Sequence, residues 1–256
     1  MSSPYLSIVV PAYNEEKRLG ATLAAILGHL SETRILGELI VVDDGSTDAT
    51  AAIVEGISRD EPRLRMIRFP TNRGKGAAVR EGALAASGRL LLVSDADLST
   101  PIGELGRLLA RMRSTASDIV IGSRGLASSR IEVRQPFWRE AMGRSFNRII
   151  RILTALRMRD TQCGFKLLDR EKTEPIFRKM VVEGFAFDVE LLVLSQLAGL
   201  RIVEEPVTWR NSPDSRVSPL RSSWAMLLDV IRVRRRVRRG FYRERARLMQ
   251  EGREGP

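Results

Sequence analysis

The sequence predicts an α/β protein with a mostly parallel central sheet flanked by helices, and three observations support this. Short apolar runs alternate with segments of helical periodicity, which is the pattern of successive strand–helix–strand units. Most apolar runs end in a polar cluster, as strands do at the ligand-binding edge of such sheets. The chain has 256 residues, of which 43% are hydrophobic, so it can bury a sizeable core.

Strands are expected in short apolar runs bounded by turn residues, at 6–10, 38–42, 63–68, 90–93 and 119–124. Helices are expected where apolar residues recur at helical spacing: after Asn14, at 49–58, within 71–87, at 136–156 and at 187–198. We expect Asn14 to cap the first helix, with Glu15 and Glu16 at its positive end.

Charge and composition restrict the function. A net charge of +11 implies an anionic partner, either nucleic acid, a phosphorylated substrate or an anionic membrane surface. The single cysteine, Cys163, excludes a disulfide framework and suits a reducing compartment. With only one histidine, His29, any metal must be held by oxygen ligands.

Membrane-spanning and secretory features are not expected. The N-terminal sequence MSSPYLSIVV has no signal-peptide pattern, and no apolar run approaches the roughly 18 residues that cross a bilayer. We therefore expect a cytoplasmic protein that is soluble or peripheral to a membrane.

The stretch 89–101, RLLLVSDADLSTP, organises the candidate site. Asp95 and Asp97 follow a buried strand, and two carboxylates so close together repel each other unless a positive group lies beside them. Mg²⁺ or Mn²⁺ would satisfy both, since these ions take carboxylate and phosphate oxygens. The alternative is structural, with Asp95 in a turn and Asp97 as the N-cap of a helix beginning at Leu98.

Two further loops follow predicted strands. Asp43 and Asp44 end the second strand, where they could also be an acidic turn with Ser46 or Asp48 capping the next helix. The NRGKG loop at 72–76 could cradle phosphate, although it matches neither the P-loop nor the dinucleotide fingerprint.

In combination these motifs are specific. PAYNE, VVDDGSTD, NRGKG and SDAD, in this order and spacing, resemble the nucleotide-sugar-binding half of the inverting glycosyltransferases of family 2, which have the GT-A fold. The segments QPFWRE, DTQCGFKLL, FAFDVELLVLSQLAG and EEPVTWRNSPDSRVSP resemble more narrowly the dolichyl-phosphate β-glucosyltransferases, which are related to the dolichyl-phosphate mannose synthases. The resemblance implies a catalytic domain at 1–216, followed by a basic helical tail at 217–256.

The resemblance also implies residue roles on the donor side. The residues that it implies bind the nucleotide sugar are Pro11, Ala12, Tyr13, Glu15, Asp43, Lys75, Asp95, Ala96, Asp97, Gln162, Ser215 and Arg216. Among them Asp97 and Asp95 would bind Mg²⁺ or Mn²⁺, and Gln162 would line the sugar pocket. Ser215 and Arg216 stand where the family has a Ser-Lys pair over the diphosphate, so a planar guanidinium replaces a compact ammonium.

On the acceptor side the resemblance implies that Arg124 and Arg139 bind the acceptor phosphate and that Asp188 faces the reacting carbon. The alternatives are a solvated surface charge for Arg124, and for Asp188 a favourable interaction with a helix N-terminus that it shares with Glu190.

The expected activity is transfer of a hexose, glucose from UDP-glucose as the leading choice, to a polyprenyl or dolichyl phosphate, with inversion. The alternatives are a sugar or protein hydroxyl acceptor, and GDP-mannose or UDP-N-acetylglucosamine as the donor. A nucleic-acid-binding protein would explain the charge but not the polar loops at the strand ends, so no nucleic acid partner is expected.

The tail from Ser222 is expected to be one basic amphipathic helix. It could pack on the catalytic domain, bind nucleic acid or lie on an anionic bilayer at the cytoplasmic face. Only Phe241 and Tyr242 are available to stack on bases, which favours the bilayer. The apolar stripe, which includes Trp224 and Leu228, is also compatible with a homodimer.

Overall fold

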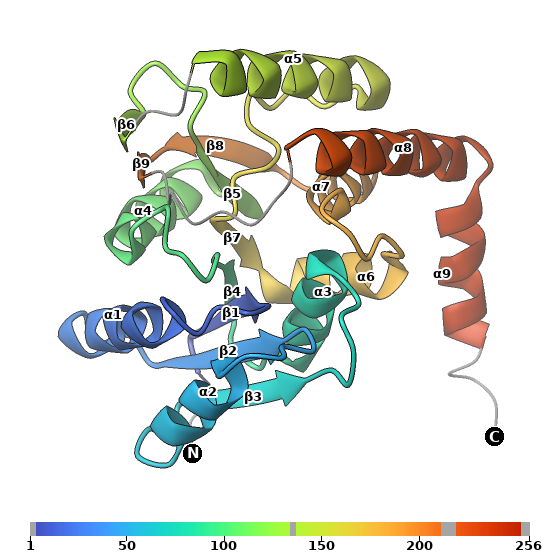
Figure 1. Ribbon diagram of the computed structural model, residues 1–256. Coiled ribbons are helices and arrows are strands. Elements are labelled where there is room, and N and C mark those ends of the chain that lie inside the picture. The colour runs from blue at the N-terminus through green and yellow to red at the C-terminus, as the bar shows by residue number, and fades with distance from the viewer. Residues whose placement is uncertain (1–3, 134–136, 211–218, 252–256) are drawn as a thin grey trace.

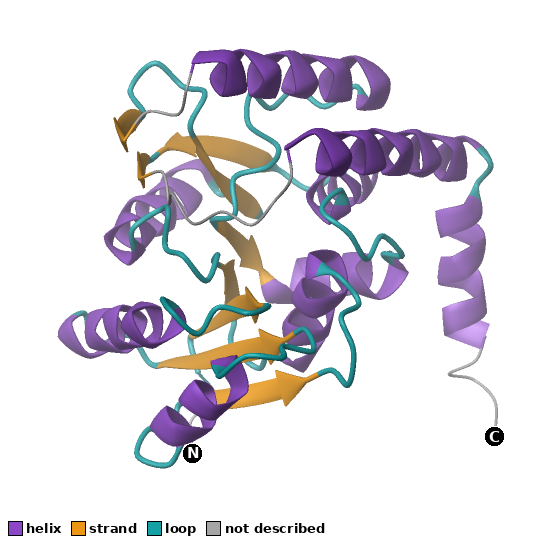
Figure 2. Ribbon diagram, viewed as in Figure 1, coloured by secondary structure: helices purple, strands orange, loops and turns teal. Residues whose placement is uncertain are grey.

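The computed structural model describes residues 4–133, 137–210 and 219–251, and a seven-stranded sheet lies at its centre (Figures 1 and 2). The strand order is β3-β2-β1-β4-β7-β5-β8. The strands are β1 (Leu6–Ala12), β2 (Gly37–Asp43), β3 (Leu64–Arg68), β4 (Leu90–Val93), β5 (Ile119–Ser123), β7 (Lys166–Asp169) and β8 (Ile202–Pro206). All four residues of β4 are apolar and buried, as predicted for that run.

One strand departs from the parallel arrangement that the alternating pattern predicts. β7 lies between β4 and β5 and is antiparallel to both, whereas the other pairs in the sheet are parallel. Its first residue, Lys166, is therefore paired with Val93 and Ile121, near the carboxyl ends of β4 and β5. Because β7 runs in the opposite direction, it begins at the edge of the sheet where the parallel strands end.

Helices cover both faces of the sheet. They are α1 (Leu19–Glu32), α2 (Thr50–Ser58), α3 (Lys75–Ala85), α4 (Leu105–Thr115), α5 (Phe137–Thr154), α6 (Arg170–Lys179) and α7 (Phe187–Leu197), with a short 3₁₀ turn, η1 (Ile102–Glu104), before α4. On one face α3, α6 and α7 contact one another, whereas on the other α1 contacts α2 and η1. A separate pair, β6 (Arg130–Val133) with β9 (Thr208–Arg210), completes the described strands.

The expected N-cap role of Asn14 is wrong. Helix α1 begins at Leu19, four residues later than the cap would require, and Asn14 has a left-handed φ of 55°. Its Oδ1 accepts a hydrogen bond from the Thr47 backbone N–H (2.9 Å), and its own N–H donates to Ser46 Oγ (2.9 Å). An Asn side chain tolerates this backbone conformation, so the residue cross-links two loops instead of starting a helix.

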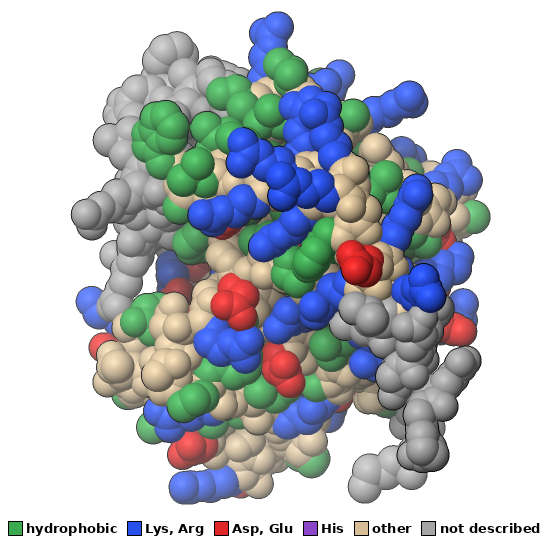
Figure 3. Space-filling model, turned by 90° about the vertical axis from the view of Figure 1, so that its right-hand side faces the viewer, with side chains coloured by type: hydrophobic (Ala, Val, Ile, Leu, Met, Phe, Trp, Pro, Cys, Tyr) green, Lys and Arg blue, Asp and Glu red, His purple; other side chains and the backbone are tan. Residues whose placement is uncertain are grey.

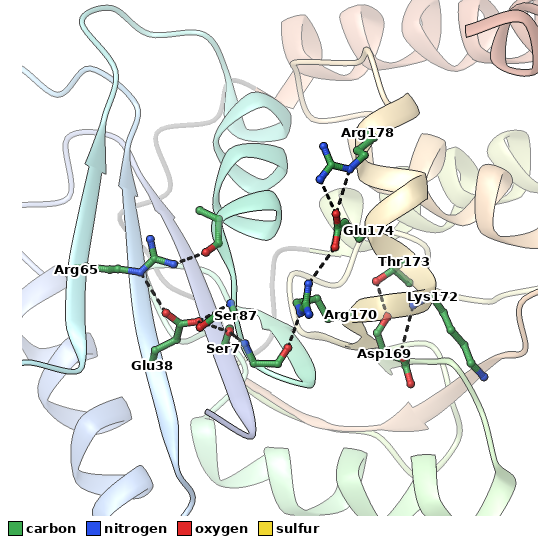
Figure 4. Close-up of polar contacts among 12 residues, drawn as sticks. Ser7, Glu38, Arg65, Ser87, Asp169, Arg170, Lys172, Thr173, Glu174 and Arg178 are labelled. Carbon is green, nitrogen blue, oxygen red and sulfur yellow. Dashed lines mark hydrogen bonds and ion pairs between the residues drawn. The ribbon is translucent and has the colours of Figure 1, made fainter. Parts of the chain in front are cut away.

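The amino-terminal edge of the sheet is fixed by polar contacts (Figure 4). Glu38, at the start of β2, accepts hydrogen bonds from Ser7 Oγ (2.6 Å) and Ser87 N (2.7 Å), and it pairs with Arg65 at 3.1 Å. Arg170 donates to the carbonyl of Gly88 (2.7 Å), which joins α6 to the start of β4. These contacts hold the strands in register at the edge away from the candidate site.

The C-terminal tail forms two helices, α8 (Pro219–Arg238) and α9 (Phe241–Glu251), instead of the single helix expected. Gly240 separates them with a φ of 73°, a conformation that glycine adopts at little cost. Val230, Val233 and Tyr242 are buried in the same hydrophobic core as the sheet. The tail therefore packs on the α/β unit and turns sharply along its side, as Figure 1 shows. Within the described residues, none of the helices is both long and apolar enough to cross a bilayer.

Candidate active site

The carboxyl ends of β1, β2 and β4 and the start of β7 meet at one edge of the sheet, and most of the predicted site residues lie there. Pro11 and Ala12 are the last residues of β1 and are buried, while Tyr13 follows them and is exposed. Ala96 is buried as well, and its carbonyl accepts a hydrogen bond from Thr22 Oγ1 (2.7 Å). The sequence pattern predicted that these residues lie near one another, because the carboxyl ends of parallel strands lie along the same edge of a sheet.

Asp43 and Asp44 have different partners. Asp43 is fully buried, accepts the backbone N–H of Ser46 (3.0 Å) and lies 3.1 Å from Arg68 Nε. Asp44 accepts the N–H groups of Arg73 (2.7 Å) and Gly74 (2.8 Å), so its carboxylate fixes the glycine-rich loop. Burial raises the pKa of Asp44 in spite of these bonds. Asp44 thus organises a loop that the sequence suggested only as a phosphate cradle.

Lys75 begins α3 and extends toward Asp95, with 2.6 Å between Nζ and Oδ1. Burial lowers the pKa of Lys75, but the Asp95 and Asp188 carboxylates outweigh this effect and the pKa lies above its ordinary value. Burial also opposes ionisation of Asp95, and Lys75 more than offsets it, so the pKa of Asp95 is lowered. Both groups are therefore charged at neutral pH.

Asp97 lies in a turn, not at a helix N-cap. Its Oδ1 accepts the backbone N–H of Ser99 (2.9 Å), Leu98 has a φ of 44°, and the next helical residue is Ile102. The other carboxylate oxygen is 3.7 Å from Arg18 Nη1. Arg18 also pairs with Glu15, which links the first loop of the site to the Asp97 turn.

Lys166 is a charged residue of the site that the sequence analysis missed. Its side chain is 1% exposed, and Nζ lies 2.5 Å from Asp188 Oδ1, while the Asp188 side chain is 6% exposed. Burial raises the pKa of Asp188, and Lys166 and Lys75 oppose that rise only in part. The available signal was a lysine within the otherwise apolar run FKLL, because lysine is almost never fully buried unless it is paired.

Gly164 packs directly against the carboxylate of Asp95. A Cβ atom at position 164 would lie 1.9 Å from Asp95 Oδ2, which is far inside van der Waals contact. The preceding residue, Cys163, is buried, and its carbonyl accepts a hydrogen bond from Lys166 Nζ (2.5 Å). The sequence pattern CGFK therefore places a glycine where the carboxylate of Asp95 needs room.

The donor set suits a hard cation that shares its ligands with a substrate. Among the described residues there is no cluster of three or more His, Cys, Asp or Glu side chains that could enclose a metal ion. Asp95 and Asp97 are partly exposed carboxylates in a cradle that only glycine permits. Two carboxylates with open positions match Mg²⁺ or Mn²⁺ bound together with phosphate oxygens. Asp95 and Asp97 therefore fit the ion, provided that the substrate supplies the remaining ligands.

Arg124 follows β5 and is held by Asp160. The guanidinium donates from Nε (2.7 Å) and Nη2 (2.9 Å), and the Arg124 backbone N–H donates to the same carboxylate (3.0 Å). Glu204 on β8 supports the pair by accepting the backbone N–H of Asp160 (2.9 Å). Arg124 also lies over the ring of Trp209, 5.6 Å from its centroid. The alternative of a freely solvated charge is therefore wrong.

A groove of about 970 Å³ begins at Arg124 and Asp160 and runs along α5. Its lining combines arginines with apolar side chains: Arg124, Arg148, Arg151, Arg159, Ile131, Ile152, Leu156 and Trp209. Asp160 is the only acid among the described residues that line it. The sequence pattern indicated a basic amphipathic helix here but did not reveal that the helix forms a wall of a groove.

Two predicted site residues and the side chain of a third lie outside the described part, and a fourth residue has an unexpected partner. Ser215 and Arg216 are not among the described residues, nor is the side chain of Arg139 in α5. Gln162 is described, and its side-chain amide contacts the sulfur of Met226 on α8. The tail therefore reaches the segment that was expected to line the sugar pocket.

Glu190, the second acid of α7, is fully buried and does not face the site. Its carboxylate accepts the backbone N–H of Val182 (2.8 Å) and the hydroxyl of Tyr242 on α9 (2.6 Å). The neighbouring carbonyl of Glu183 accepts the N–H of Gly76 (2.7 Å). Glu190 thus joins the tail to the loop that supports the start of α3.

Comparisons with known proteins agree with this geometry. The family model for glycosyl transferase family 2 matches residues 7–177. The chain is 35% identical to the dolichyl-phosphate β-glucosyltransferase of Dictyostelium discoideum over 250 residues, covering 93% of this chain and 76% of the relative. It is 34% identical to the human protein of the same name, with coverage of 95% and 79%.

Solved structures show the same fold at lower identity. Glucosyl-3-phosphoglycerate synthase from Mycobacterium tuberculosis, in complex with UDP, aligns with a TM-score of 0.66 at 20% identity, covering 90% of this chain and 80% of the other. Mannosyl-3-phosphoglycerate synthase from Rubrobacter xylanophilus aligns with a TM-score of 0.65 at 19% identity, with coverage of 99% and 76%. The family match, the relatives and the GT-A architecture together show that this chain is a glycosyltransferase and belongs to glycosyl transferase family 2.

Proposed function

We propose that this enzyme transfers glucose from UDP-glucose to a polyprenyl phosphate, with inversion at the anomeric carbon and with a divalent cation. The observation that carries the proposal is the groove along α5, which begins at Arg124 within electrostatic reach of Asp95. A polyprenyl phosphate has an anionic head and an apolar chain, and the groove offers arginines and apolar side chains in the same space. Relatives at 34–35% identity carry the name dolichyl-phosphate β-glucosyltransferase, which supports the same acceptor.

The donor would lie over the carboxyl ends of β1, β2 and β4. In this proposal Pro11, Tyr13 and Asp43 surround the base and ribose, and Lys75 approaches the diphosphate. To do so, the flexible side chain of Lys75 exchanges its contact with Asp95 for the phosphate oxygens. Fold neighbours crystallised with Mn²⁺ and UDP support a uridine donor.

A Mg²⁺ or Mn²⁺ ion held by Asp97 and Asp95 would stabilise the negative charge on the leaving diphosphate. The chain's own residues supply the rest. Arg124, fixed by Asp160, orients the acceptor phosphate and offsets its repulsion from the donor diphosphate. Because the second pKa of a phosphate is about 6, the acceptor is mostly dianionic at neutral pH and needs little help from a general base. Asp188 then faces the reacting carbon.

The anionic membrane surface is part of the same proposal. Four large apolar side chains are exposed on α5 and α8, two helices that contact each other: Ile149, Ile152 (71% exposed), Trp224 (68% exposed) and Leu228. We call these four residues the α5–α8 surface. Figure 3 shows Lys and Arg side chains gathered beside hydrophobic ones over the upper half of the face that carries the tail. Apolar and basic side chains together fit the interface of an anionic bilayer.

A transfer assay tests the reaction. Purified enzyme receives Mn²⁺, a polyprenyl phosphate and one labelled donor, either UDP-glucose, UDP-N-acetylglucosamine or GDP-mannose. We expect labelled glucosyl lipid with inverted stereochemistry from UDP-glucose. Labelled product on soluble sugar or protein hydroxyls, with none on the lipid, would show that the acceptor proposal is wrong.

Vesicle binding tests the membrane proposal separately. Wild-type protein is expected to sediment with phosphatidylcholine vesicles that contain phosphatidylglycerol, and much less with pure phosphatidylcholine. Ile152→Ser should weaken this binding about tenfold, since burying such a side chain contributes roughly 1.5–3 kcal/mol. Leu36→Ser, which alters an equally exposed side chain away from α5 and α8, is the matched control. Equal loss in both variants would contradict a specific role for the α5–α8 surface.

The cytoplasmic location and the homodimer stay predictions. Sedimentation equilibrium of the purified protein checks whether it is a dimer.

A further inference from the structure

Lys166 connects elements that the reaction needs to hold in fixed positions. Its ammonium group bonds Asp188 Oδ1 on α7 and the carbonyl of Cys163, each at 2.5 Å. Asp188 would face the reacting carbon, whereas Cys163 leads into Gly164, the residue that packs against Asp95. One buried cation therefore contacts two of the segments that enclose the expected donor sugar.

The antiparallel direction of β7 explains how Lys166 reaches both segments. A parallel strand in this position would place its first residue at the far edge of the sheet. Because β7 is antiparallel, Lys166 lies opposite Val93, two residues before Asp95. The side chain is 1% exposed, so solvent does not compete for its donors.

Stability alone does not explain a buried lysine at this position, since a well-packed apolar residue often stabilises a fold as much as a buried ion pair does. Lys166 contacts the carboxylate of Asp188 on α7 directly and interacts electrostatically with Asp95, after β4, and with the buried Asp160. Its direct contact with Asp188, and its bond to the residue before Gly164, which packs against Asp95, favour a role in the reaction.

We propose that Lys166 is a positioning residue of glucosyl transfer, which orients Asp188 toward the donor sugar while the Cys163 carbonyl holds the ammonium group in place. This inference rests on the proposed function, because it takes the donor sugar to lie between Asp95 and Asp188. The bonds of Lys166 go to Cys163 and Asp188, not to the residues of β1 and β2 that the proposal assigns to the nucleotide, so its loss should affect the rate of transfer more than the binding of the donor.

The test compares Lys166→Met, Asp188→Asn and the double variant in the transfer assay and in urea denaturation. For Lys166→Met we expect kcat to fall about 100-fold, the loss that a displacement of about 1 Å within a site can cause, with the donor KM within about threefold of wild type. Lys166→Met leaves the buried carboxylate of Asp188 without its cation, so this variant should be less stable than wild type. The double variant removes both charges, so it should recover stability but not kcat, and its kcat should match that of Asp188→Asn alone.

Lys172→Met is the matched control, because it breaks a Lys–Asp contact of the same 2.5 Å length on the surface, where the lysine side chain is 54% exposed. It should leave kcat unchanged. A double variant that recovers both stability and kcat would show that Lys166 is only structural. A kcat loss in the double variant equal to the product of the two single losses would show that it does not act through Asp188. If wild-type enzyme itself makes no glucosyl lipid, the proposed function is what fails.

Discussion

Replacing Asp160 by Asn tests how the acceptor end of the site is held. Asp160 is 2% exposed and accepts hydrogen bonds from the Arg124 side chain and backbone and from the backbone of Gln162. Asn has the same shape but no charge, and its amide group adds donors where Arg124 already supplies them. The change therefore removes the ion pair with little alteration of packing.

The size of the effect follows from the pKa of Asp160. Burial raises this pKa, but Arg124 outweighs burial and brings it from an ordinary 3.8 to about 2. Since one pKa unit corresponds to about 1.4 kcal/mol, ionised Asp160 contributes about 2 kcal/mol to folding at neutral pH. The folded pKa lies below the unfolded one, so this contribution is complete above about pH 4 and is lost as the pH falls toward 2.

Urea denaturation at pH 7 and pH 3 measures the effect. Asp160→Asn should be less stable than wild type by about 2 kcal/mol at pH 7, and the difference should shrink to about half at pH 3. Asp60→Asn, which neutralises an exposed carboxylate, is the control for the loss of one charge. We also expect a higher KM for polyprenyl phosphate with unchanged donor affinity. A stability difference that is the same at both pH values would refute the assignment of the effect to the ion pair.

Four further predictions concern the same site. Gly164→Ala should weaken binding of UDP-glucose with Mn²⁺ at least tenfold by calorimetry, because the added methyl group displaces Asp95; Gly106→Ala, with open space around it, should not. Tyr242→Phe should lower the free energy of unfolding by about 1.5–3 kcal/mol, the usual value for a hydrogen bond to a charged group, and an unchanged urea midpoint would contradict the role of its bond to Glu190. Asp188→Asn should slow but not abolish transfer to a phosphate acceptor; complete loss would instead indicate a required general base and a hydroxyl acceptor. Chelation with EDTA should stop transfer and added Mn²⁺ or Mg²⁺ should restore it, whereas full activity in EDTA would exclude the proposed metal dependence.

Local sequence patterns were enough to predict most strands and the edge where the site lies. The run 90–93 is apolar because both faces of its strand are covered, and Asp95 follows at the point where such strands open to ligands. The order of four polar loops along the chain predicted the family, and the family comparison confirmed it. These features depend on residues close together in the chain, which is why they can be read from it.

Pairings between distant segments could not be predicted. Nothing local to Lys166 shows that its strand is antiparallel or that Asp188, 22 residues later, supplies its counter-ion. Likewise the partner of Arg124 is Asp160, 36 residues away, and the two meet only after the chain has passed through β6 and α5 and returned to the end of β5. Charge patterns along a chain report the excess of arginine but not which arginines are neutralised.

The sequence by itself determined the fold class, the family and the edge of the sheet that carries the acidic motifs, because repeated strand–helix units and turn chemistry are local properties. Only the tertiary structure decided the direction of β7, the burial of Lys166 and the attachment of α9 through Tyr242. The physical reason is that a buried charge is stable only beside its partner, and which partner is near depends on how the whole chain packs.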